Sequence, residues 1–228
     1  MESILEPTKN LINLLTNTDS FVDLSNAKFM YPIELLPIAA LISESSKKYI
    51  KPTDENCNAY LNFFNFPNGL MKPQPPSSKY IPIYKFFASN NDDKSLRDKS
   101  IILESLIAIC LSKLGSPEGS VSALNLAIDE IISNIEDHSE AKFGWINAQF
   151  YPKKKYLDVC MLDRGITITG KYKKVGIIYN DLEALKNAME GKSTKPEKTR
   201  GSGLRTFVNM IINGFNGEIV IISGNAIS

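Results

Sequence analysis

Residues 120–138 read SVSALNLAIDEIISNIEDH and carry two stripes of side chains at helical spacing. Glu130, Asn134 and His138 are each four residues apart, so they share one face of the predicted helix, with Asp137 beside them. Such a polar stripe is also typical of an ordinary solvated helix face. The second stripe is apolar and predicts burial against a core; its members are Val121, Leu124, Ile128, Ile131, Ile132 and Ile135.

A second motif, Asp163-Arg164-Gly165-Ile166-Thr167, follows the predicted strand Tyr156 to Leu162. An acidic residue after an apolar strand, followed by glycine, presents a carboxylate at a sheet edge and then turns. A simple strand-to-loop turn has the same pattern, so this motif alone is weak.

A third motif, Arg200-Gly201-Ser202-Gly203-Leu204, stands immediately before a predicted helix. Glycines at a helix start let backbone N–H groups converge on an anion. The motif is not a Walker loop, because no Gly-Lys-Ser/Thr ends it, and no strand feeds it as in a Rossmann fingerprint. A flexible loop that joins a helix is the alternative reading.

The remaining patterns predict an α+β fold in two parts, an N-terminal α/β domain over residues 1–95 and a larger domain over 96–228. The boundary is placed at residues 90–98, after the Pro-rich stretch 72–78 and the polar stretch 89–93. Strands are expected at 21–24, 80–87, 143–150, 156–162 and 218–222, with the third and fourth paired as a hairpin. Helices are expected at 33–48, 58–64, 101–114, 120–138, 180–190 and 204–212.

The net charge, the cysteine and histidine counts and the hydropathy of the chain argue against several classes of function. The 228 residues carry a net charge of +1, which argues against a broad electrostatic grip on nucleic acid or on anionic lipid, while a small basic site is compatible with that average. The three cysteines are far apart, as is typical of reduced thiols, and one histidine leaves little material for a His-rich metal site. No signal peptide or membrane span is apparent, so a soluble, cytoplasmic protein without a membrane partner is expected.

Together and in this order, the three motifs resemble those of the GHKL, or Bergerat-fold, ATPases, and most closely the anti-sigma-factor kinases. The resemblance covers residues 101–228 and implies a mixed sheet covered by helices. Glu130-x-x-x-Asn134-x-x-x-His138 resembles the N box, Asp163-x-Gly165 the G1 box, and Gly201-x-Gly203-Leu204 the G2 box. The family's G1 box usually has a second glycine, and Thr167 stands there in this chain.

The resemblance implies ATP and Mg²⁺ as cofactors and a role for each matching residue. Asp163 would accept a hydrogen bond from the adenine amino group, with Gly165 and Thr167 beside the base. Asn134 would supply its amide oxygen to Mg²⁺, and Glu130 would act as general base. Asp137 and His138 would complete the nucleotide site.

The phosphates would be bound by the third motif and the segment before it. Gly201, Ser202, Gly203 and Leu204 would wrap the β- and γ-phosphates. Residues 169–199 would form the ATP lid, and Lys195, Lys198 or Arg200 would neutralise phosphate charge.

The N-terminal part weakly resembles a STAS domain, the fold of anti-sigma-factor antagonists, through the strand at Phe21–Leu24 and the helix that follows. No serine or threonine stands at that helix start, so this part is expected not to accept phosphate. Its apolar helix, Ile33 to Ile42, is expected to dock on the C-terminal part or on a partner.

The predicted function is Mg²⁺-dependent ATP binding with slow hydrolysis in a regulatory protein. A serine/threonine protein kinase and a non-catalytic, nucleotide-gated interaction module are the alternatives. A protein partner of unknown identity is expected, and a homodimer is among the expected states.

Overall fold

The computed structural model describes residues 4–16, 20–72, 77, 79–88, 93–113, 120–138, 140–192 and 203–228. It is an α+β structure, as predicted, and its contacts divide it into two compact units that interleave along the chain. The first unit is Met1–Phe87, Ser100–Ser116 and Phe143–Leu162, and the second is Ala88–Lys99, Pro117–Lys142 and Asp163–Ser228. The division into residues 1–95 and 96–228 stays a prediction.

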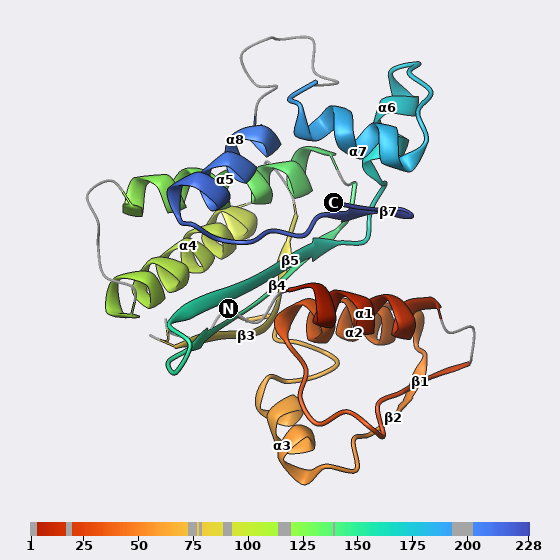
Figure 1. Cartoon of the computed structure of the whole chain (residues 1–228), viewed down its shortest axis with the longest axis vertical. Coiled ribbons are helices and arrows are strands. Elements are labelled where there is room, and N and C mark those ends of the chain that lie inside the picture. The colour runs from red at the N-terminus through yellow and green to blue at the C-terminus, as the bar shows by residue number, and fades with distance from the viewer. Residues whose placement is uncertain are drawn as a thin grey trace. The chain divides into compact units, whose positions relative to one another are not determined.

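A three-stranded sheet forms the centre of the first unit, in the order β3 (Tyr80–Phe87), β4 (Phe143–Tyr151), β5 (Tyr156–Asp163) (Figure 1). β3 and β4 are antiparallel, with a register shift at Pro82, which lacks a donor for the ladder. Phe86 pairs with Gly144, and a Cβ there would lie 2.2 Å from the Phe86 ring, so only glycine fits. β4 and β5 are neighbours joined by the turn at residues 152–155, as predicted.

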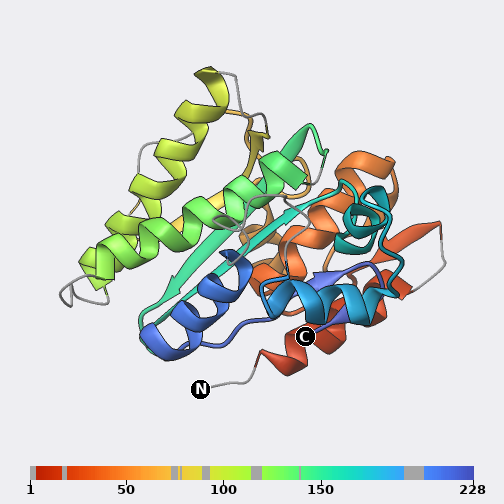
Figure 2. The same ribbon diagram turned by 90° about the horizontal axis from the view of Figure 1, so that it is seen from above.

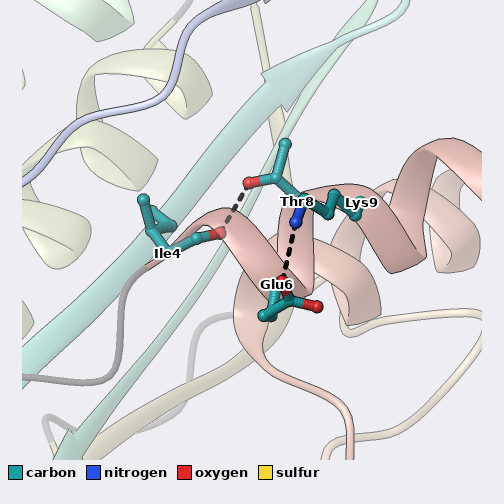
Figure 3. A network of polar contacts seen from close by, with 4 residues as sticks. All are labelled: Ile4, Glu6, Thr8 and Lys9. Carbon is teal, nitrogen blue, oxygen red and sulfur yellow. Dashed lines mark hydrogen bonds and ion pairs between the residues drawn. The ribbon is translucent and has the colours of Figure 1, made fainter.

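The N-terminal segment adds three helices and a small parallel pair of strands to this unit. The α1 helix is held at its start by the Thr8 hydroxyl, which donates to the Ile4 carbonyl at 2.7 Å, and by a Lys9–Glu6 ion pair (Figure 3). The bounds are α1 (Leu5–Thr16), β1 (Phe21–Asp23), α2 (Pro32–Ser45), β2 (Lys48–Ile50) and α3 (Glu55–Phe63). The likeness to a STAS domain stays a prediction.

The apolar helix α2 is buried within the chain, where it packs against α1 and β4. Trp145 of β4 is fully buried, and its indole N–H donates to Glu44 Oε1 at 3.0 Å. Lys85 Nζ lies 4.5 Å from the Trp145 ring centroid and 3.5 Å from Glu44 Oε1. These contacts hold the C-terminal end of α2 on β4, so the apolar helix packs on a strand of the predicted C-terminal part (96–228), the first of the two expected alternatives.

Acidic and aromatic side chains gather on the side of the sheet where α2 and α3 lie. The Tyr60 hydroxyl donates to Gln149 Oε1 at 2.5 Å, and the Tyr60 and Phe29 rings are 4.9 Å apart. Burial, with nearby Glu34, raises the pKa of Asp158 to about 6. Burial also raises the pKa of Glu34, although its carboxylate accepts the Tyr31 N–H at 2.9 Å. The folded state therefore resists ionisation of these acids.

The long helix α4 (Asp93–Lys113) begins in the second unit and continues in the first, where it buries Ile102, Leu106 and Ile109. It begins eight residues before the expected start at Ile101. No helix in the described ranges is long and apolar enough to cross a membrane.

The second unit is mainly helical. Helix α8 packs against α5 and α7, and α7 packs against α6 and β7 (Figure 2). Its other elements are α5 (Ser120–His138), α6 (Ile168–Lys174), α7 (Asp181–Met189), α8 (Gly203–Asn209), the π-helix η2 (Met210–Gly214), β6 (Ile222–Ser223) and β7 (Ala226–Ile227).

Two sequence predictions for this unit are corrected. A strand was expected at 218–222, but β6 comprises only Ile222–Ser223. Its antiparallel pairing with β7 is preceded by backbone hydrogen bonds between Ile221 and Ser228. The helix expected to Ile212 changes to a π-helix at Met210, and Gly217 N–H then bonds the Ile211 carbonyl at 2.9 Å. Helix α6 is new, since it falls in the segment expected to be lid.

The Asp158→Asn variant should be more stable than the parent at pH 8 and nearly equal to it at pH 4. Folding raises the pKa of Asp158 from 3.8 to about 6, so the folded protein binds this proton more tightly than the unfolded chain. The free energy of unfolding therefore falls as the pH rises between those values, by up to about 3 kcal/mol. Denaturant unfolding at both pH values checks this, with Glu55→Gln on the surface of α3 as control. Equal stability of Asp158→Asn and parent at pH 8 would contradict it.

Candidate functional site

Helix α5 carries the first motif, and three of its faces have different surroundings. The core face buries three members of the predicted apolar stripe, Ile128, Ile132 and Ile135, and also Ala127, which was not predicted. Three further members of that stripe, Val121, Leu124 and Ile131, are half-buried.

The second face of α5 binds one lysine from α4. Lys99 Nζ lies 2.6 Å from Asp129 Oδ1 and 4.0 Å from Glu136 Oε2, and it donates to Ser133 Oγ at 3.3 Å. The Lys99 side chain is 18% exposed and that of Glu136 is 7% exposed, so solvent screens this pair less than a surface ion pair. Lys99 therefore fixes the rotation of α5 about its own axis.

The third face carries Glu130 and Asn134, which are both half-buried. They are one helical turn apart, so their side-chain oxygens lie on the same face of α5. Asp137 and His138 are the last two residues of α5, and their side chains lie outside the described residues.

Helix α8 contains the last residues of the third motif and packs against α5, which carries the first motif. It begins at Gly203 and continues through Leu204. The motif residues Gly201 and Ser202, and the lid residues Lys195, Lys198 and Arg200, lie outside the described residues. The structure therefore brings the helix that follows the third motif against the helix that carries the first.

The second motif forms a turn at the end of β5. Asp163 is the last residue of the strand, is half-buried, and accepts the Gly165 N–H on Oδ1 at 2.8 Å. Thr167 caps α6, because its hydroxyl accepts the Gly170 N–H at 3.2 Å. A glycine at residue 167 would leave that N–H without this bond.

Asp181, at the start of α7, joins three parts of the second unit. It accepts the Thr169 hydroxyl at 2.5 Å, and the Asn225 backbone and side-chain N–H groups at 2.9 and 3.2 Å. Gly224 has φ +60°, and a Cβ there would lie 2.5 Å from Asp181 Oδ2, so glycine is required beside the carboxylate. The Thr169 and Asn225 hydrogen bonds hold the pKa of Asp181 below its usual range.

The described part of the expected lid is therefore helical and anchored. The Ile168 N–H donates to Ser223 Oγ at 3.0 Å, and Thr169 is bound through Asp181. Tyr172 is buried and its hydroxyl donates to the Lys192 carbonyl. Of the segment 169–199, residues 169–192 thus hold α6, α7 and their anchors, and the rest lies outside the described residues.

Sequence reasoning missed Lys99 and Asp181. Asp129, Ser133 and Glu136 recur at helical spacing beside the apolar stripe, which was a signal for a partner on that face of α5. Asp181 had no such signal, because an acidic residue in the first turn of a helix is common.

The described acidic, cysteine and histidine side chains do not form a metal cluster. Within the described ranges, no group of three or more His, Cys, Asp or Glu side chains gathers in a metal-binding arrangement. Mg²⁺ is usually held by one or two protein oxygens together with substrate phosphates, and Asn134 offers one such oxygen.

Comparisons with protein-family models, with curated proteins and with solved structures find no match to this chain. Any function assigned to this chain therefore rests on its residues and their geometry.

The Asp181→Asn variant should release α6 from the β6–β7 turn. The asparagine can still accept from Thr169, but its amide N–H group faces the Asn225 donors and cannot accept from them. Hydrogen exchange near residues 168 and 225 should become about tenfold faster, as for the loss of a hydrogen bond to a charged group. In the parent the same protection should disappear as the pH falls through the lowered pKa of Asp181.

Asp181→Ala serves as the second variant and should have an equal or larger effect. Exchange in α5 should stay unchanged in both variants. Parent-like protection at residues 168 and 225 in Asp181→Ala would contradict the anchoring role.

Proposed function

We propose that this chain is a Mg²⁺-dependent ATP-binding protein of the Bergerat type that hydrolyses ATP slowly and acts as a nucleotide-controlled switch. The supporting observation is that one compact unit contains Glu130, Asn134, the Asp163–Gly165 turn and the start of α8. Helix α5 packs against α8, so two motifs far apart in the sequence belong to one helical layer.

The proposed base contact uses the Asp163 turn. An ionised carboxylate has about four acceptor sites, so the bond from the Gly165 N–H leaves capacity for the adenine amino group. The same bond fixes the Asp163 rotamer. A guanine carbonyl at that position would set two acceptors against each other, so this site would select adenine.

The proposed reaction uses the third face of α5. Asn134 would offer an amide oxygen to Mg²⁺, which supplies charge neutralisation for the phosphates when bound. Glu130 is one turn earlier on the same face, where it would take a proton from a water molecule or a substrate hydroxyl. The Lys99 contacts on the neighbouring face would keep α5 in the orientation about its own axis that both roles require. Lys195, Arg200, Gly201 and Ser202 remain proposed phosphate contacts.

The Asp163→Asn variant should bind ATP at least about tenfold more weakly, equivalent to about 1.4 kcal/mol. Asparagine keeps an Oδ1 acceptor for the Gly165 N–H, so the turn should survive while the negative charge is lost. Isothermal titration calorimetry with ATP and Mg²⁺ measures this, and the far-ultraviolet spectrum checks the fold. Unchanged affinity in a folded Asp163→Asn protein would refute the base contact.

Glu130→Ala and Asn134→Ala should have separable effects. Glu130→Ala should still bind ATP but lose turnover, because a general base acts on the reaction and not on ground-state binding. Asn134→Ala should lose the Mg²⁺ dependence of binding as well. Ser122→Ala, at an exposed position on α5, is the matched control. Parent-like turnover by both variants would reject the roles assigned to this face.

Incubation with γ-labelled ATP and Mg²⁺, with and without cell lysate, separates hydrolysis from the two alternatives. Free phosphate supports the proposed ATPase, and labelled protein indicates a serine/threonine kinase. Binding without either product indicates a nucleotide-gated interaction module.

A further inference from the structure

The connector between α6 and α7 exposes apolar side chains that the proposed nucleotide site does not use. Ile178 is 89% exposed, and Val175 and Ile177 beside it are 49% and 37% exposed. Leu182, in the first turn of α7, is 64% exposed. Isolated exposed apolar residues are ordinary, but four in one short segment mark an interaction surface. We call these four residues the apolar tip.

Backbone hydrogen bonds and an aromatic contact at Tyr172 stabilise the turn that carries the apolar tip. Val175 and Ile177 donate their N–H groups to the Tyr172 carbonyl at 3.1 and 3.0 Å. The buried Tyr172 ring lies 5.1 Å from the Tyr179 ring, edge to face. Gly176 turns the chain with φ +80°, and no atom lies within 4 Å of where its Cβ would stand. The turn is thus ordered at its base and open at its end, so little conformational entropy would be lost on binding.

Positive charge precedes the apolar tip along the chain, whereas Asp181 and Glu183 flank Leu182 at its other end. Residues 164–180 contain Arg164, Lys171, Lys173 and Lys174 and no acidic residue. Glu140 forms an ion pair with Lys174 and offsets one of these charges. Lys173, two residues before Val175, is exposed. Apolar side chains next to lysines are the combination that inserts into an anionic lipid interface.

We propose that the apolar tip docks this protein on an anionic lipid surface. The lysines would lie at the headgroup phosphates, and Ile178 with its neighbours would enter the boundary with the acyl chains. An open turn with its apolar side chains at the end suits a lipid surface better than a protein partner, which needs about 800 Å² of complementary surface. This inference does not depend on nucleotide binding.

Co-sedimentation of the full chain with lipid vesicles tests the proposal. Vesicles of phosphatidylcholine with roughly one third phosphatidylglycerol should bind the parent, and pure phosphatidylcholine should bind it at least about tenfold more weakly. Binding should fall as salt is raised, because the charges are exposed. Ile178→Asp and Lys173→Glu should each weaken binding to the anionic vesicles by about tenfold.

Two variants serve as matched controls. Ile178→Leu keeps an apolar side chain at the same place and should bind like the parent. Leu126→Asp adds the same charge at a residue of α5 that is 64% exposed, and it should also bind like the parent. Thermal unfolding should show that all variants are folded.

The proposal is overturned if the parent does not bind anionic vesicles, or if Ile178→Asp binds them as well as the parent does. Equal binding to neutral and anionic vesicles overturns it too. If the parent instead self-associates in solution and Ile178→Asp prevents this, the apolar tip is an interface between copies of the chain and the lipid proposal is wrong.

Discussion

The antiparallel pairing of β3 with β4 is the constraint on which the rest of this structure depends. It joins Phe87 to Phe143, and the Ala88 N–H continues the ladder to the Lys142 carbonyl at 3.1 Å. Closing so long a loop costs conformational entropy, which the buried strands must offset. Residues 88–142 lie between the two paired strands, so this segment must leave the end of β3 and return to the start of β4. Helices α4 and α5 lie in this segment.

Helix α5 shows how one segment serves packing, orientation and chemistry together. Its core face buries isoleucines, its second face holds Lys99, and its third carries Glu130 and Asn134. Because the residues on these faces alternate along 3.6-residue turns, a rotation of the helix would disturb all three at once. In the proposed function, the half-buried Lys99 contacts would help to position Glu130 and Asn134, which they do not touch.

The segment expected to form a lid combines two kinds of structure. Asp181 and Ser223 hold the start of α6 and α7 on the C-terminal hairpin, while the turn between these helices presents the apolar tip. In the proposed function, a conformational change at the phosphates would be transmitted through α8 to the α6–α7 pair, because α7 packs directly on α8. The apolar tip would carry that change to the surface that it contacts.

The sequence by itself determined most elements and the order of the three motifs, since amphipathic spacing and capping residues act locally. The helix over residues 120–138, the 143–162 hairpin and the helix at Asn180–Glu190 all follow from such signals. Only the tertiary structure decided that β3 pairs with β4 and that Lys99 and Asp181 are anchors, because the Lys99–Ser133 and Asp181–Asn225 contacts join residues 34 and 44 positions apart. The tertiary structure also decided the pairing of β6, since an apolar run forms a strand only where a partner strand meets it, and here Ile222 pairs with Ile227 and Ser223 with Ala226.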